Sequence, residues 1–347
     1  MRIADIINEY YDAFLARYGE TALPGQINAL NAMRFCRTPQ AGTIQTVCRG
    51  CGRTQQHPLS CGNRNCPHCQ NHETSLWIER QQKKLLPVNY FMVTFTLPCP
   101  FRAMAYRNQR AVFALMFSCV AGTLKDFGLN PRHLGAHIGM TMVLHTHSRQ
   151  LQFHPHIHVI VPGGGVDPAK RQWKKKTGKY LFNQKALARV FRARFLDGLN
   201  QKKLPIPNGV PPEWIVNCTR VGAGITALKY LSRYLYRGVI SEKNIIGNRD
   251  GKVTFRYIDS ETKSIRHRTL KGEDFLRLIL QHVLPRGFRR TRDFGFLHSN
   301  AKKLLALVQL ILYVRILVVK PSPKPAFKCP HCGETMVIVG VCPAGAG

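Results

Sequence analysis

The chain has 347 residues, with 51 lysines and arginines against 18 aspartates and glutamates, so its formal net charge is +33. Such an excess indicates a polyanionic partner, most often a nucleic acid. Hydrophobic residues make up 44% of the chain, which excludes a short ribosomal protein and allows two or three domains with cores. An amphipathic helix pattern, rather than a secretory signal, opens the chain.

The N-terminal part combines helices with cysteines. Apolar residues recur at helical spacing from Ile3 to Phe14, which predicts short helices over 1–45. Twelve cysteines without a signal peptide favour zinc over disulfides. Two CxxC motifs lie fourteen residues apart, which predicts one four-thiolate zinc site, and Cys61, His57 and His68 are alternative ligands. The predicted zinc ligands are Cys48, Cys51, Cys66 and Cys69.

The middle of the chain alternates strands and helices. We expect a polar helix up to Leu86, a strand over 88–97, a helix over 103–127 and a strand over 138–147. Several strands are joined as hairpins, which predicts an α+β fold whose central, largely antiparallel sheet is flanked by helices.

The most informative segment is His154-Pro-His156-Ile-His158-Val-Ile-Val161. Side chains alternate along a strand, so His154, His156 and His158 share one face, while Ile157 and Val159 point into a core. Three imidazoles in register favour a divalent-metal site over a merely hydrogen-bonded polar face. A cation held by His156 and His158 could polarise a phosphate.

Further candidates follow the histidine strand. Residues 170–176 form a basic hairpin or loop, in which Trp173 could stack on bases beside Lys174 and Lys175. We expect a helix over 184–201 and a strand over 213–221. After the helix considered next, the chain should form strands over 253–258 and 264–270 and a helix over 272–284.

A helix over 225–237 carries two tyrosines four residues apart, Tyr230 and Tyr234, on one face. Tyrosines at this spacing are often core-edge aromatics. Beside a metal-binding strand on a basic chain, a phenol can instead attack a phosphodiester and form a covalent phosphotyrosine. The cations of this segment would hold the DNA backbone, namely Lys229, Arg233 and Arg237.

The C-terminal part contains an apolar run over 304–319, which is shorter than the roughly 20 residues of a membrane span and predicts a buried or partner-facing helix. Cys329 and Cys332 form a single CxxC motif, with Cys342 as a possible third ligand and no clear fourth. The predicted domains are a helical region (1–45), a zinc module with its linking helix (46–86), a nuclease core (87–240), a hairpin and helix extending that core (241–300), and a C-terminal helix with a partial zinc knuckle (301–347).

Several of these motifs together resemble rolling-circle transposases of the insertion-sequence ninety-one type, which are two-tyrosine members of the HUH (histidine–hydrophobic–histidine) endonuclease superfamily. The resemblance covers Cys36-Arg-Thr38 and the segment 60–70, Phe95-Thr-Leu-Pro98, Leu144-His-Thr146, the segment 154–165, Tyr230-Leu-Ser-Arg-Tyr234 and Leu284-Pro-Arg-Gly-Phe288. Where the family usually has His-Thr-Trp-Gly-Gln, this chain has His145-Thr-His147-Ser-Arg149.

The resemblance implies an HUH nuclease with His156 and His158 as ligands of Mg²⁺ or Mn²⁺, and Tyr230 and Tyr234 as nucleophiles. The third ligand is open between His145, His154 and Gln152. The implied partners are single-stranded DNA at transposon ends and target DNA, with no membrane. The implied location is the bacterial cytoplasm, at the nucleoid. The sequence leaves the oligomeric state and the recognised DNA sequences open.

Two other classes compete with this reading. A carboxylate-triad transposase or nuclease is disfavoured, because the 18 acidic residues are scattered and do not cluster with the histidines. A zinc-dependent DNA-binding protein without catalysis is the main alternative. The abrupt tail 342–347 adds a related alternative, a truncated and inactive transposase remnant.

Overall fold

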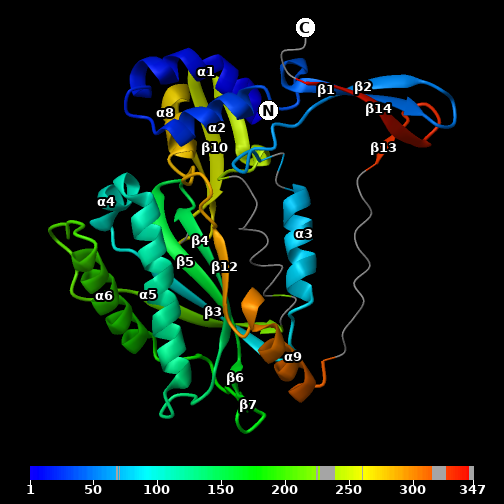
Figure 1. Ribbon diagram of the computed structural model, residues 1–347. Coiled ribbons are helices and arrows are strands. Elements are labelled where there is room, and N and C mark those ends of the chain that lie inside the picture. The colour runs from blue at the N-terminus through cyan, green and yellow to red at the C-terminus, as the bar shows by residue number, and fades with distance from the viewer. Residues whose placement is uncertain are drawn as a thin grey trace.

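The computed structural model describes residues 1–67, 69, 71–223, 226, 239–259, 261–314 and 326–343. Figure 1 shows three parts: a main body around a central sheet, a helical module above it, and a flat ribbon of strands to one side of that module. The mixed helices and antiparallel sheets confirm the predicted α+β fold class.

The main body contains a five-stranded sheet in the order β12-β4-β5-β3-β8, and every neighbouring pair is antiparallel. As predicted, the histidine segment is a central strand, next to the strand that precedes it in sequence. The strands are β3 (Asn89–Thr96), β4 (Gly139–His147), β5 (Phe153–Pro162), β8 (Val216–Ala223) and β12 (Thr291–Gly295).

Helices α4 (Phe101–Arg107), α5 (Gln109–Leu129) and α6 (Gln184–Gln201) cover one face of this sheet. Ile157 and Val159 are fully buried in the core between them, as the alternation predicts. Among the described residues, α5 is the one helix that is long and apolar enough to cross a membrane. In this fold 61% of that apolar stretch is buried, as in the core helix of a globular domain.

The opposite face of the sheet carries the even-numbered residues of β5. Trp77 of α3 (Asn71–Gln82) packs there against Val143 and Ile160. His154, His156 and His158 therefore lie on the α3 side of the sheet, away from the main core. The helix α9 (Lys302–Ile311) covers a further cluster through the buried Val308. The hairpin beside that cluster consists of β6 (Gly164–Asp167) and β7 (Gln172–Lys175).

The helical module is built from two segments that lie far apart in the sequence, 3–34 and 245–280. The prediction that 241–300 extends the nuclease core is wrong for most of that segment, because residues 245–280 share a core with the N-terminal helices. Phe255 and Phe275 are buried there against Phe14 and Leu30. The module comprises α1 (Ile3–Tyr18), α2 (Pro24–Arg34), β9 (Ile245–Arg249), β10 (Lys252–Ile258), β11 (Ile265–Lys271) and α8 (Gly272–Leu280).

The flat ribbon is a four-stranded sheet in the order β13-β14-β1-β2. Its strands are β1 (Gly42–Cys48), β2 (Thr54–Pro58), β13 (Phe327–Lys328) and β14 (Thr335–Pro343). The predicted C-terminal segment 301–347 is therefore not a separate unit, because β14 pairs along the whole of β1. Three short 3₁₀ helices complete the description, at Pro39–Ala41, Glu242–Asn244 and Ser299–Ala301.

Candidate nuclease and metal centres

Three histidines of the main sheet form a candidate metal centre. His145 of β4 stands directly opposite His156 of β5 in the antiparallel register, and His158 lies two residues further on the same face. One ring nitrogen of each lies within 4.8 Å of those of the other two. This group matches the divalent site predicted from His156 and His158, and its third member is His145.

His154 and Gln152, the other two candidates for the third ligand, lie outside this group. The ring of His154 is 5.3 Å from that of His156, and its Nδ1 accepts a hydrogen bond from Arg102 at 3.1 Å. Gln152 is exposed, and its backbone N–H donates to Ser148 Oγ in the preceding turn. The alternation of β5 placed His154 on the correct face, but Arg102 holds its ring.

Burial makes these imidazoles neutral. It lowers the pKa of His156 to about 4 and, together with the nearby His156, the pKa of His158 to about 3. Burial also lowers the pKa of His145 well below its usual value. A neutral imidazole offers a nitrogen lone pair, so at neutral pH all three side chains can act as ligands without first losing a proton.

Neighbouring groups orient the rings. Nδ1–H of His156 donates to the carbonyl of His154 at 2.7 Å, which leaves Nε2 as the lone-pair nitrogen. Nδ1 of His158 is hydrogen-bonded to Thr94 Oγ1 at 2.9 Å, from the facing position on β3. Sequence reasoning missed Thr94, although the alternation of its predicted strand would have put it on the histidine face.

His147 stands where the family usually has tryptophan, and its side chain fills the space beside the three histidines. Its ring lies 6.1 Å from that of His145 and 5.4 Å from that of His282, which is also buried. His282 is fixed by its Nε2–H, which donates to the carbonyl of Leu151 at 2.8 Å. No pattern in the sequence indicates His282, because it lies in the turn directly after α8 of the helical module.

The predicted tyrosine helix lies outside the described residues. This covers Lys229, Tyr230, Arg233, Tyr234 and Arg237. The described chain before it ends β8 beside β3, and the chain after it resumes at Val239, which packs on the core of the helical module.

The predicted base-stacking hairpin is only partly available to a ligand. Trp173 packs against Phe296, with ring centroids 6.0 Å apart, and so belongs to a core cluster. Nζ of Lys174 donates to the carbonyl of Gly135 at 2.7 Å. The half-buried ring of Trp173 is therefore partly occupied by this packing, and its stacking role stays a prediction, whereas Lys175 is exposed.

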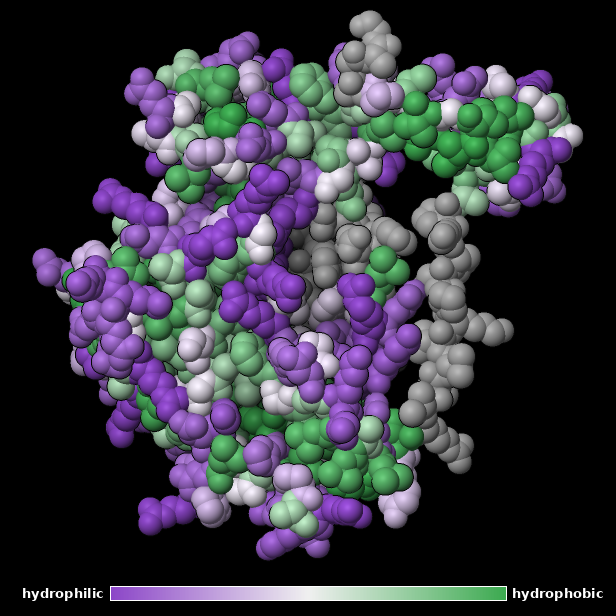
Figure 2. Space-filling view, in the orientation of Figure 1, coloured by the Kyte–Doolittle hydropathy of each residue, from purple (hydrophilic) through white to green (hydrophobic). Residues whose placement is uncertain are grey.

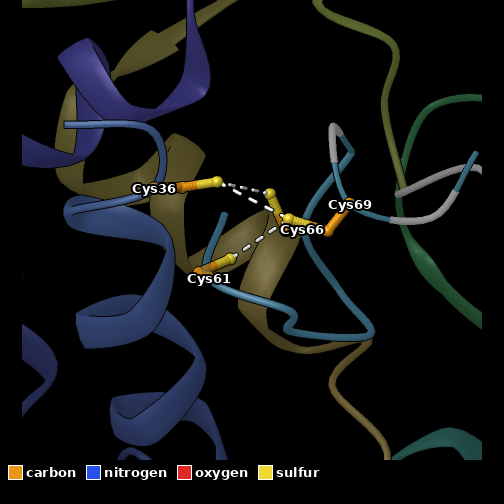
Figure 3. A group of neighbouring side chains, drawn as sticks. All are labelled: Cys36, Cys61, Cys66 and Cys69. Carbon is orange, nitrogen blue, oxygen red and sulfur yellow. Dashed lines mark hydrogen bonds between the residues drawn. The ribbon is translucent and has the colours of Figure 1, made fainter. Parts of the chain in front are cut away.

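Eight cysteines form two groups of four, and the predicted single site is wrong in its pairing. The first group, shown in Figure 3, consists of Cys36, Cys61, Cys66 and Cys69. Sγ of Cys69 lies 3.6 Å from Sγ of both Cys36 and Cys61. Hydrogen bonds from the Cys61 and Cys66 thiols lower the pKa of Cys36, so a thiolate forms readily. Among the earlier alternatives, Cys61 is a member, and His68 lies outside the described residues.

The second group consists of Cys48, Cys51, Cys329 and Cys332, and so joins two segments that lie far apart in the sequence. Cys48 Sγ lies 3.4 Å from Cys332 Sγ, and Cys51 Sγ lies 3.7 Å from Cys329 Sγ. The cause is the pairing of β1 with β14, which sets Cys48 opposite Met336. Backbone N–H groups of Cys332 and His331 lower the pKa of Cys329 to about 6. Cys342 is exposed and belongs to neither group, and His57 stacks on Phe327 instead.

The described residues show no carboxylate group of the kind a carboxylate nuclease needs. In the described part of the chain, no aspartate or glutamate belongs to any of the three candidate metal groups.

Comparison with known proteins gives matches along most of the chain. Residues 139–304 match a family described as "Putative transposase", and residues 6–97 match a "Transposase zinc-binding domain". The protein named "Putative transposase y4qJ" from Sinorhizobium fredii (strain NBRC 101917 / NGR234) is 35% identical over 329 residues, which cover 87% of this chain and 81% of that protein. The "Transposase for insertion sequence element IS801" from Pseudomonas savastanoi pv. phaseolicola is 25% identical over 347 residues, covering 90% and 83%. No solved structure gives a significant match.

These matches make the chain a transposase, a class of protein that acts on DNA. Within that class it belongs to the insertion-sequence ninety-one family, as its motifs implied. The matched zinc-binding domain and the four-thiol groups also support Zn²⁺ as a cofactor. Cys329 and Cys332 lie beyond both matched segments.

Proposed function

We propose that this transposase cleaves and rejoins single-stranded DNA by a rolling-circle mechanism, with Tyr230 and Tyr234 as nucleophiles. The observation that carries the proposal is the group of three neutral imidazoles on neighbouring strands, in a chain of a transposase family. The tyrosines enter from their spacing in the sequence and from the family resemblance.

His145, His156 and His158 would hold Mg²⁺ or Mn²⁺. The donor set fits, because three buried imidazoles supply lone pairs at neutral pH and leave coordination positions open. The bound ion would act as a Lewis acid on a phosphate oxygen. The protein itself holds the rings in place, through the carbonyl of His154 and the hydroxyl of Thr94.

The tyrosines would carry the covalent step. The phenolic oxygen of Tyr230 or Tyr234 attacks the phosphorus, the bond from phosphorus to the 3′ oxygen breaks, and the phenolic proton is lost to solvent. The products are a 5′-phosphotyrosine and a free 3′-hydroxyl. Attack of a 3′-hydroxyl on the phosphotyrosine then restores a phosphodiester and frees the tyrosine, so no external energy source is needed.

DNA binding would depend on the large positive charge of the chain. Lys229, Arg233 and Arg237 would hold the backbone near the scissile phosphate, and Lys175 is an exposed cation further away. We propose single-stranded transposon ends and target DNA as substrates, in the bacterial cytoplasm at the nucleoid. Affinity should fall steeply with added salt, because each phosphate contact releases counterions.

We propose one zinc ion in each cysteine group. Four thiolates close the coordination shell, so these ions would stabilise the helical module and the ribbon and take no part in cleavage. The first ion would fix residues 61–69 against the end of α2, and the second would join the two ends of the chain.

A nicking assay on a labelled single strand tests the nuclease proposal. With Mg²⁺ or Mn²⁺ the natural chain should nick the strand, and the double variant Tyr230→Phe/Tyr234→Phe should not. His156→Ala should stop nicking but retain DNA binding. Undiminished nicking by the double tyrosine variant would favour a different nuclease. DNA binding without any nicking by the natural chain would favour the non-catalytic alternative.

A further inference from the structure

A cavity of about 590 Å³ lies where the helical module meets the nuclease core. Its wall comes from three segments that are far apart in sequence: residues 23–28 at the start of α2, residues 106–111 at the junction of α4 and α5, and residues 283–286 after α8. Its volume is in the range of pockets that hold small molecules. In Figure 1, α2 lies above α4, and Figure 2 shows hydrophilic side chains gathered at this junction.

A buried side chain in the wall of this cavity lacks a partner. Gln109 is only 5% exposed, and its Nε2 has no hydrogen-bond partner among the described residues. A buried amide donor without a partner is unfavourable. The neighbouring Gln26 differs, because its Nε2 donates to Tyr106 Oη at 2.8 Å and to the carbonyl of Leu280 at 3.0 Å. Gln109 therefore brings an unsatisfied donor to the wall of the cavity.

The cavity is also suited to an anion. Arg107, Arg110 and Arg286 line it and are exposed, and no acidic residue is among the described residues of its wall. The first turns of α2 and α5 both contribute to the wall, and the positive end of a helix dipole favours phosphate.

Part of the remaining wall is apolar and aromatic. Pro24, Val283, Leu284 and Pro285 line it together with Tyr106. The ring of Tyr106 is held edge-on against Phe153 at 5.5 Å and is half-buried. A wall that combines cations, a lone amide donor and an apolar surface matches a nucleotide, which carries phosphate, a polar base edge and a flat apolar face.

We propose that this cavity holds one nucleotide of the single-stranded DNA, unstacked from its neighbours, with the phosphate on the arginines and the base against the apolar wall. Gln109 Nε2 would donate to an acceptor on the base edge. This inference rests on the proposed function for the identity of the DNA, and it assigns to the strand a recognition site separate from the histidine centre.

Helix α4 connects the two sites. Arg102 contacts His154 beside the histidine centre, and Tyr106 lines the cavity four residues later. A strand that continues along α4 from the histidine centre would place a further nucleotide in the cavity.

The first test measures binding of a fluorescent single strand of mixed sequence, without added Mg²⁺ or Mn²⁺, to the full chain carrying Tyr230→Phe and Tyr234→Phe. This background prevents cleavage, so the outcome does not depend on the nuclease proposal. Arg107→Ala with Arg286→Ala should weaken binding about tenfold and lower the salt slope by about 1.4, for two lost phosphate contacts. Gln109→Leu should weaken it by about tenfold.

A matched control removes the same charge elsewhere. Arg132 and Arg189 are exposed and lie toward the far end of α5, so Arg132→Ala with Arg189→Ala should change the affinity by less than about twofold. Equal losses in both pairs would mean only non-specific attraction and would overturn the proposal. Thermal unfolding checks the Gln109 variant, and the exposed arginine variants test the proposal if that variant unfolds.

The second test places a nucleotide directly. A strand carrying 5-iodouracil at one position, scanned along its length, should form a photo-crosslink to the peptide that contains Tyr106, and Gln109→Leu should abolish it. Excess deoxyuridine monophosphate should not compete. Strong competition would show that the cavity binds a free nucleotide. Crosslinks confined to other peptides would show that the DNA strand does not enter the cavity. Either result would overturn the proposal. The natural chain should still form its covalent adduct with DNA in both cases, because that adduct tests the proposed nuclease function and not the cavity.

Discussion

His145 and His156 come from neighbouring strands of one hairpin, whereas the sulfur atoms of Cys51 and Cys329, 3.7 Å apart, are separated by 278 positions in the sequence. The pairing of β4 with β5 brings the histidines together, and Thr94 and the carbonyl of His154 orient their rings. The second cysteine group instead depends on a small ribbon at the two chain ends. The comparison shows one candidate metal group built by a single hairpin and another built by the pairing of segments that lie far apart in the sequence.

The largest expected effect concerns the cysteines. The chain should bind two zinc ions, and Cys36→Ser and Cys329→Ser should each remove one, because their thiolates belong to different groups. Loss of zinc should unfold the local structure, since structural zinc contributes on the order of 10 kcal/mol. Zinc content by elemental analysis, with Cys342→Ser as the control, checks this. A single zinc that both variants retain would contradict the two groups and restore the predicted site of Cys48, Cys51, Cys66 and Cys69.

The next effect concerns activity and leaves the fold intact. His145→Ala or His158→Ala should lower the rate of strand cleavage by about a thousandfold, because a Lewis acid contributes several kcal/mol. His154→Ala should have a much smaller effect, since Arg102 holds that ring. Single-turnover cleavage rates and circular dichroism measure both. Equal losses at positions 145 and 154 would contradict the assignment of the third ligand.

Acid should destabilise the main body through the same histidines. Their pKa values are lowered to about 4 at His156 and about 3 at His158, below the unfolded value near 6.5. The unfolded chain therefore binds more protons below pH 6.5, and stability falls as the pH drops from 6.5 toward 4.

We expect a loss of about 5 kcal/mol by pH 4.5 from these two groups, without added divalent metal. Chemical denaturation at each pH measures it. The double variant His156→Ala/His158→Ala should show a flatter profile over this range, after the common contribution of the zinc groups is subtracted. An unchanged slope would show that these imidazoles are already charged in the folded chain.

The smallest expected effect tests the hairpin. Trp173→Ala should lower the free energy of unfolding by about 2 kcal/mol, because the ring packs on Phe296. Its effect on single-strand affinity should be within about twofold. Lys175→Ala should cause a small loss of single-strand affinity and leave the free energy of unfolding unchanged. A large loss of affinity with Trp173→Ala would favour base stacking.

The sequence predicted what local pattern determines. Alternation alone placed His156 and His158 on one face and Ile157 in the core, and the structure confirms both. It could not choose between His145 and His154, because the choice depends on strand register and on Arg102. The cysteine pairing failed because proximity in sequence favoured Cys48 with Cys66. The pairing of β1 with β14 overrides that proximity, and no short-range pattern records it.

The number of cysteines in these motifs indicates two four-thiolate sites rather than one. Three CxxC motifs with Cys36 and Cys61 make eight thiols, which is two sets of four. The helical module was also missed, because α1 and α8 share one core although the end of α1 at Tyr18 and the start of α8 at Gly272 are 254 positions apart (272 − 18). Tyr230 and Tyr234 lie outside the described residues, so their role stays a prediction from spacing and resemblance.

Trapping of the covalent intermediate tests the central claim most directly. A single strand with a scissile phosphate close to its 5′ end would lose the short 3′-hydroxyl fragment after cleavage and leave the rest of the strand on the protein. Mass spectrometry of the digested adduct should find the 5′-phosphate on Tyr230 or Tyr234, and only when Mg²⁺ or Mn²⁺ and the three histidines are present. An adduct on another residue, or cleavage with no adduct at all, would contradict the account.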